Sequence, residues 1–199
     1  MRSALRTFDN RTFDKEASTL KQALWLYFNA VFFKSPYFPF IGFKKWLLVL
    51  FGAKVGERFV IKPSVHIKFP WKLEMGNDVW LGEHVWIDNL DHVSIGHDVC
   101  MSQDSMLLTG NHDYSVASFD FRNAPIVLEN GVWIGAKAIV CPGVTCRSHS
   151  ILTVGSVATT NLEPYSIYQG NPAQLIRKRV FKNQNISPPK PANEELITG

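Results

Sequence analysis

The stretch that decides the fold is LENGVWIGAKAIVCPGVTCRSHSIL, residues 128–152. An apolar residue recurs there at every sixth position, namely at Leu128, Ile134, Val140, Cys146 and Leu152. The fourth position after each of the first four is small or β-branched, as at Val132, Ala138, Val144 and Ser150. This is the hexapeptide repeat of a parallel β-helix, in which three hexapeptides close one triangular coil. A single coil cannot bury its apolar face, so stacked coils share one continuous core.

The same period extends toward the N-terminus as far as Val55. Its earlier members are Val55, Ile61, Ile67, Met75, Leu81, Ile87, Ile95, Met101 and Leu107. Two-residue slips before Met75 and before Ile95 predict small bulges at coil corners. We therefore expect a mainly β chain whose β-helix domain occupies residues 55–164.

The period breaks between Leu107 and Leu128. We expect residues 108–127, approximately, to form a loop extruded from the prism. Long loops on rigid scaffolds carry function more often than other loops do. This one contains TGNHDYS, residues 109–115, in which His112 stands between Asn111 and Asp113.

His112 is the main candidate for chemistry, because a prism filled with aliphatic side chains leaves no internal pocket. The other five histidines fall within the repeat, where polar side chains ordinarily occupy surface and corner positions. A histidine held at one ring nitrogen by a carboxylate or a carbonyl can accept a proton at the other nitrogen. That arrangement suits general-base removal of a hydroxyl proton. The neighbouring Asp113 and Asn111, or a backbone carbonyl, are the candidates for orienting the ring.

Residues 1–54 form a separate segment with two apolar runs, 19–33 and 40–53, which we expect to be helical. The segment carries nine Lys/Arg against three Asp/Glu, whereas residues 55–181 carry ten against twelve. The net charge of +4 therefore belongs to the first quarter of the chain, and nucleic acid is not an expected partner. Two interpretations stay open: the segment caps the β-helix, or it is an interfacial contact with the inner face of the cytoplasmic membrane.

The C-terminal part leaves the repeat. We expect a turn and a short helix over residues 165–181 and a disordered, proline-rich tail over 182–199. Three cysteines with no C-x-x-C pair, and a start without the apolar run of a signal peptide, predict a cytoplasmic protein with reduced thiols. No metal site is expected.

The chain resembles the hexapeptide-repeat acyltransferases of the left-handed β-helix superfamily, and among them the colanic acid biosynthesis acetyltransferases. The resemblance spans residues 51 to about 179. The hexapeptide pattern specifies only the superfamily, whereas three further stretches are more specific: FPWKLE (69–74), SQ followed by TGNHDYS (102–115), and QGNPAQLIRKR (169–179).

This resemblance implies an acetyl-CoA-dependent O-acetyltransferase that modifies a saccharide or a lipid-linked sugar during exopolysaccharide or cell-surface glycan biosynthesis. It also implies a homotrimer with each active site between two prisms. His112 takes the family's place of general base. Asn89, or the adjacent Asp88, takes the place of a residue that binds the acceptor.

The resemblance further implies a binding site for acetyl-CoA along the C-terminal coils. The matching positions are Trp133, Ala136, Gly155, Thr159, Thr160, Arg177 and Arg179. Thr160 departs from the basic residue that related enzymes place after the threonine. Arg177 and Arg179 match a terminal basic cluster that suits phosphate groups.

Three other functions compete with O-acetylation. The same prism also serves N-acetylation of an amino sugar or a nucleotide sugar. A zinc carbonic-anhydrase-like site needs three converging histidines, and His92 and His97 have a fitting spacing for two of them. A non-catalytic β-helix scaffold would have no need of the histidine loop.

Overall fold

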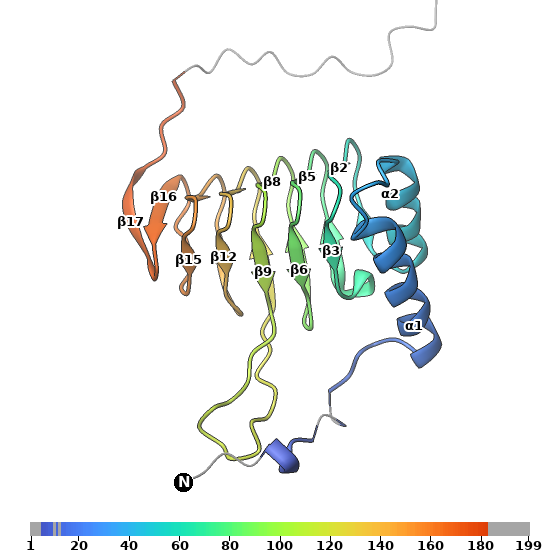
Figure 1. Cartoon of the computed structure of the whole chain (residues 1–199). Helices are drawn as coiled ribbons and strands as arrows, with labels where there is room; N and C mark the ends of the chain where they lie inside the picture. Colours follow the sequence, from blue (N-terminus) through green and yellow to red (C-terminus); the bar gives the residue numbers. More distant parts are fainter. Residues whose placement is uncertain (1–4, 10, 12, 183–199) are drawn as a thin grey trace, which may run out of the picture.

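The computed structural model describes residues 5–9, 11 and 13–182, and it shows a parallel β-solenoid with three sheets (Figure 1). Sheet A contains β1 (Lys54–Val55), β4 (Leu73–Met75), β7 (Val93–Ile95), β10 (Ile126–Leu128) and β13 (Thr145–Cys146). Sheet B contains β2 (Val60–Ile61), β5 (Trp80–Leu81), β8 (Cys100–Met101), β11 (Trp133–Ile134), β14 (Ile151–Leu152), β16 (Ser166–Gly170) and β17 (Ala173–Lys178). Sheet C contains β3 (His66–Ile67), β6 (Trp86–Asp88), β9 (Met106–Leu108), β12 (Ile139–Val140) and β15 (Val157–Ala158). The predicted β-helix is confirmed.

The repeat residues fill the prism because the strands pair in register from coil to coil. In sheet B, for example, Leu81 pairs with Met101, Met101 with Ile134, and Ile134 with Leu152. Each of these four side chains is at most 1% exposed. Each inward apolar side chain thus stacks on an apolar side chain of the next coil, and in this way the short strands share one core.

The corner between sheets C and A, called the C–A corner below, absorbs every irregularity of the repeat. Both two-residue slips fall there, the first in the connection that holds the 3-10 turn η3 (Pro70–Lys72). The extruded loop also leaves at this corner, between β9 and β10, so it spans residues 109–125. Figure 1 shows it projecting well away from the prism.

The N-terminal helices close the first end of the solenoid (Figure 1). They are α1 (Thr19–Phe28), which Ser18 caps, the π-helical turn η2 (Asn29–Phe33) and α2 (Ile41–Leu50); a short 3-10 turn, η1 (Leu5–Thr7), precedes them. Trp25 and Asn29 both donate side-chain hydrogen bonds to the carbonyl of Ile67, at 2.9 and 3.0 Å. Leu47 and Leu48 of α2 are fully buried on the same end of the core. None of the helices in the described residues is long and apolar enough to cross a membrane.

The short C-terminal helix expected within residues 165–181 is wrong. β16 continues sheet B by pairing in parallel with β14, and β17 returns antiparallel to it. A solenoid that ended at β14 would expose a full edge of unpaired backbone groups, and the hairpin covers this edge. The predicted disordered tail, 182–199, lies outside the described residues except for Lys182.

Candidate functional site

The extruded loop has a paired stem that fixes its position on the prism. The stem is built from backbone hydrogen bonds that link Thr109 to Ala124, Asn111 to Arg122 and Asp113 to Asp120, at 2.8–3.1 Å. Thr109 also anchors the base, because its hydroxyl donates to the carbonyl of Asp88 at 3.0 Å. This loop is therefore a projecting hairpin rather than a loose connection.

His112 lies in this hairpin, where its ring is both hydrogen-bonded and stacked. Its Nδ1 is 2.7 Å from the carbonyl oxygen of Phe119, which can only accept a hydrogen bond. Nδ1 therefore carries a proton, and in the neutral ring Nε2 is the nitrogen with the free lone pair. The rings of Phe119 and Phe121 stack on the imidazole at centroid distances of 4.3 and 4.9 Å, and Phe8 meets it edge-on at 5.7 Å.

The sequence neighbours of His112 do not orient its ring. The carboxylate of Asp113 accepts hydrogen bonds from the backbone N–H and the hydroxyl of Ser115. These bonds hold the pKa of Asp113 below its ordinary value. Asn111 accepts the backbone N–H of His112 at 2.8 Å, so it shapes the turn. Of the orienters considered from the sequence, the structure brings a backbone carbonyl to the ring, and this carbonyl belongs to Phe119.

Asn89 lies at the C–A corner one coil before the loop, and its side chain is already hydrogen-bonded within the fold. Its amide nitrogen donates to the carbonyl of Phe69 at 2.6 Å, and its Oδ1 accepts the N–H of Phe69 at 2.9 Å. The side chain is fully buried and clips two coils together. Asp88 is nearly buried and forms an ion pair with Lys68 at 2.8 Å. The expected contact of Asn89 with an acceptor does not fit this arrangement, because the side chain is fully buried and both ends of its amide already bond to Phe69.

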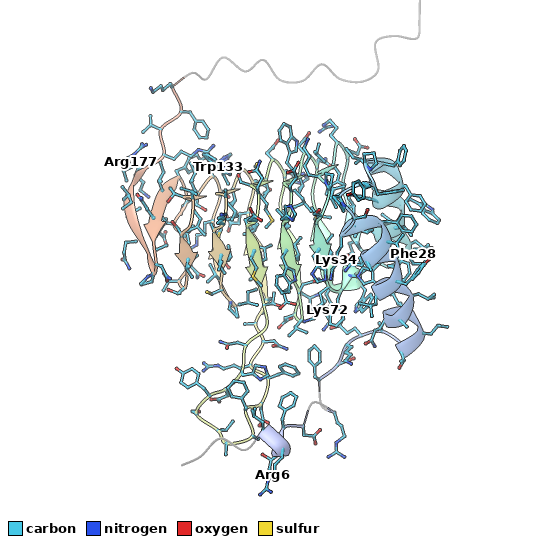
Figure 2. The ribbon with its side chains drawn as sticks, viewed as in Figure 1. Arg6, Phe28, Lys34, Lys72, Trp133 and Arg177 are labelled. Atoms are coloured by element: carbon cyan, nitrogen blue, oxygen red, sulfur yellow. The ribbon has the colours of Figure 1, made fainter. Side chains whose placement is uncertain are left out.

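Three of the candidate cofactor residues lie on neighbouring parts of the prism. Trp133 is 45% exposed on the outer face of sheet B, where its indole N–H donates to the hydroxyl of Ser102 at 2.9 Å (Figure 2). Ala136 and Gly155 follow at the corner between sheets B and C, joined by a 2.8 Å backbone hydrogen bond. A Cβ added at Gly155 would meet no atom within 4 Å, so this corner is open to a ligand.

The remaining cofactor candidates are spread over other parts of the coil end. Thr159 and Thr160 are exposed at the C–A corner after β15. Arg177 is exposed on β17, at the far end of the solenoid (Figure 2). Arg179 is instead tied to the corner between sheets A and B, where one guanidinium nitrogen donates to the carbonyls of Gly131 and His149 at 3.0 and 3.1 Å. Burial lowers the pKa of Arg179, and its bonds indicate a structural clip rather than a phosphate ligand.

His92 and His97, the pair with zinc-like spacing, face different partners. Nε2 of His92 lies 3.3 Å from a carboxylate oxygen of Glu16, whereas Nδ1 of His97 accepts the backbone N–H of Asn77 at 3.0 Å. Within the part of the chain that the structure describes, no three His, Cys, Asp or Glu side chains are grouped so that they could hold a metal ion.

Comparisons with known proteins agree with this architecture. The "Putative colanic acid biosynthesis acetyltransferase WcaF" of Escherichia coli K12 is 36% identical over 163 residues, which cover 82% of this chain and 90% of the relative. A hexapeptide-repeat acetyltransferase of Vibrio cholerae, solved with acetyl-CoA, superposes with a TM-score of 0.74 at 20% identity, over 87% of this chain and 93% of that one. A galactoside acetyltransferase solved with coenzyme A gives a TM-score of 0.67 at 22% identity, over 83% and 85%. No protein-family model matches the chain.

Proposed function

This chain belongs to the family of the colanic acid biosynthesis acetyltransferases, hexapeptide-repeat enzymes of the β-helix fold, and we propose that it transfers the acetyl group of acetyl-CoA to a hydroxyl of a saccharide. The product would enter an exopolysaccharide or another cell-surface glycan. The name of the E. coli relative supports this role, and the two solved neighbours support the donor, because one holds acetyl-CoA and the other coenzyme A.

The observation that carries the proposal is the hydrogen bond between Nδ1 of His112 and the carbonyl of Phe119. It leaves Nε2 as a proton acceptor on a ring that the stacked phenylalanines hold in place. In the proposed reaction, Nε2 removes the proton of the acceptor hydroxyl while the hydroxyl oxygen attacks the thioester carbon. The tetrahedral intermediate then expels the thiolate of coenzyme A, which takes the proton back from the imidazolium. The carbonyl of Phe119 stabilises that imidazolium.

The donor would lie along the open face and corner formed by Trp133, Ala136 and Gly155. An exposed indole offers a flat apolar surface, and the open space beside Gly155 admits a chain close to the backbone. Arg177, which is exposed, is the better candidate of the two arginines for a phosphate group, because Arg179 is already bound to two carbonyls.

Substitution of His112 tests the proposed base. We expect His112→Asn to lower the turnover number by about 10²–10⁴-fold, because general-base catalysis contributes about that much. His84→Asn is the matched control, since His84 is exposed at a coil corner with φ 58°, which asparagine tolerates. The assay follows coenzyme A release over a panel of nucleotide-linked and lipid-linked sugars, and mass spectrometry identifies the products.

Two outcomes would contradict the proposal. Turnover that survives in His112→Asn would show that another group is the base. A product whose acetyl group resists mild alkali would be an amide, which would make the enzyme an N-acetyltransferase of an amino sugar or a nucleotide sugar. An ester is cleaved under the same conditions.

A further inference from the structure

The chain before α1 reaches the histidine loop from a distant part of the fold. This N-terminal arm consists of the described residues 5–9, 11 and 13–16. Figure 1 shows it leaving α1 and running to the projecting hairpin, and Figure 2 labels Arg6 at its far end, beside the loop. The arm therefore bridges the first end of the solenoid and the candidate catalytic histidine.

The FPWK stretch of the first coil holds the arm. The indole N–H of Trp71 donates to the carbonyl of Lys15 at 2.7 Å. The ammonium of Lys72 donates to the carbonyl of Asp14 at 3.0 Å and forms an ion pair with Glu16 at 3.0 Å. The Lys72 side chain is only 4% exposed, so these bonds to the arm are buried and charge-assisted and are not a solvent-exposed ion pair.

Beyond the anchor, aromatic rings join the arm to the loop. Phe13 packs on Phe121 at a centroid distance of 5.1 Å, and Phe8 packs on Phe121 at 5.2 Å. Phe121 in turn stacks on His112. Phe8 also meets the His112 ring edge-on at 5.7 Å, so the arm forms a wall directly beside the proposed base.

A cavity of about 420 Å³ opens between the arm and the loop. Its lining residues are Asp9, Phe13, Asp120, Phe121 and Asn123. Carboxylate and amide oxygens accept hydrogen bonds from hydroxyls, and phenyl rings pack against the apolar face of a sugar ring. The volume falls within the range of about 300–1,000 Å³ that is usual for small-ligand sites.

We propose that this cavity is the subsite for the acceptor sugar, with Asp9, Asp120 and Asn123 on its hydroxyls and Phe13 and Phe121 on its ring face. This inference rests on the proposed acetyl transfer to a saccharide. The described lining contains no lysine or arginine, but Arg11 pairs with Asp9 at 2.6 Å, so Asp120 is the lining carboxylate for which no ion pair is described. The subsite therefore fits a neutral pyranose and disfavours a uronic acid, whose carboxylate would be repelled.

Binding measured apart from turnover tests the subsite. In saturation-transfer NMR, the full-length protein should bind neutral methyl pyranosides and should bind methyl glucuronide at least tenfold more weakly. Phe13→Ala and Asp120→Asn should each reduce neutral-sugar binding at least tenfold. Phe40→Ala and Asp104→Asn are matched controls, because Phe40 is exposed beside α2 and Asp104 lies at a coil corner with φ 57°. These controls should bind as the wild type does.

The outcomes separate the subsite from the catalytic proposal. Sugar binding that is absent, or that is unchanged in both subsite variants, overturns the subsite. Sugar binding that depends on Phe13 and Asp120, together with no acetylated product, would leave the subsite standing and would contradict the proposed reaction. With both correct, the two variants raise KM for the sugar and leave KM for acetyl-CoA unchanged.

A second, independent observation concerns the end of the solenoid that α1 and α2 cover, called the helical end below. It concerns the outer side of these two helices. α1 and α2 are apolar on both sides, and their outward side chains remain exposed: Leu20, Leu24, Leu26, Tyr27, Phe43, Trp46, Val49 and Leu50 are 36–70% exposed. The sequence from 17 to 56 contains five lysines and no Asp or Glu. Lys44 is buried and Lys54 pairs with Glu74, so Lys21, Lys34 and Lys45 supply the positive charge of this end. Exposed aliphatic and aromatic side chains beside positive charge are the composition of helices that lie in the interface of an anionic membrane.

We infer that this helical end docks on an anionic lipid surface. Each helix has 10 residues, which suits lying in the interface rather than spanning it. The two faces lie at one end of the solenoid, so the prism would stand away from the bilayer (Figure 1).

Vesicle sedimentation of the full-length protein tests this surface. Vesicles that contain phosphatidylglycerol should bind the protein, and pure phosphatidylcholine vesicles should bind it at least tenfold more weakly. Trp46→Ser with Leu50→Ser should reduce binding at least tenfold, because two large apolar side chains would no longer enter the membrane interface. Leu175→Ser with Ile176→Ser, on the exposed face of β17, is the matched control. Equal vesicle binding by both double variants would overturn the inference. A fall in oligomer mass for Trp46→Ser with Leu50→Ser would also overturn it, because it would show that a second copy of the chain covers the face.

Discussion

Lys44 is a buried cation without a described hydrogen-bond partner. Its ammonium is inaccessible, lies 5.9 Å from the ring centroid of Phe33 and makes no hydrogen bond within the described residues. Burial lowers the pKa of this group, because a charge is poorly solvated there. We expect Lys44→Met to raise the free energy of unfolding by about 1–3 kcal/mol, since it removes an unpaired polar group and keeps the volume. Urea unfolding at pH 7 measures this, and a variant less stable than the wild type would show that Lys44 has a stabilising role.

His66 makes stability depend on pH. It lines a cavity of about 320 Å³ beneath α1 and stacks on Trp86 at 5.3 Å. Burial, aided by Lys34 and Lys68 and opposed by Asp88, lowers its pKa to about 4 from an ordinary value of 6.5. As pH falls from 6.5 toward 4, His66 binds a proton in the unfolded chain but stays neutral in the folded chain, so the free energy of unfolding falls.

The contribution of His66 can be isolated above pH 5, where carboxylates with ordinary pKa values near 4 stay ionised in both states. We expect the free energy of unfolding to fall between pH 6.5 and 5, and His66→Gln to flatten this slope. His84→Asn is the control and should keep the wild-type slope. If His66→Gln has the same slope as the wild type, another group is responsible for the pH dependence.

At the scale of an element, a coil corner requires glycine where the backbone of the neighbouring coil comes too close for a Cβ. A Cβ at Gly135 would lie 2.6 Å from the backbone nitrogen of Val154, which real contacts do not show. In α2, a Cβ at Gly42 would meet nothing within 4 Å. We expect Gly135→Ala to destabilise the protein by about 1–3 kcal/mol and Gly42→Ala to stabilise it by about 0.5–1 kcal/mol. Thermal unfolding of the two variants would contradict this if their order were reversed.

The elements also show what the sequence could predict. The repeat in residues 128–152 predicted the strands and their register, because inward positions of a stacked coil accept only apolar side chains. The turn and short helix predicted for residues 165–181 are a β-hairpin instead, because pairing with the preceding coil decides their conformation. The sequence predicted His112 as a site residue, but not the carbonyl of Phe119 that orients its ring. Every residue has a backbone carbonyl, so residue type cannot identify the one that bonds the histidine. The contacts of the N-terminal arm join positions 56 to 58 residues apart, and no local pattern reveals them.

For the whole molecule, the outer faces of the prism differ in a way that favours association. The outer row of sheet A is polar except for Val127; its other members are Lys54, Glu74, Ser94 and Thr145. The outer rows of sheets B and C carry exposed tryptophans: Trp80 is 57% and Trp86 is 41% exposed. Large apolar side chains gathered on two faces of a prism indicate surfaces that other copies cover.

We therefore expect a homotrimer in which sheet B of one copy meets sheet C of the next, because a closed cyclic assembly uses two different patches on each copy. Light scattering should give three times the chain mass of 22.5 kDa. Trp80→Glu and Trp86→Glu should each lower the mass and the turnover together, since each site would lie between copies. Ser94→Glu on sheet A is the control and should remain a trimer. A monomeric wild type that still transfers acetyl groups would contradict this assembly. The whole active site would then lie within one chain, with the arm and the loop as its walls.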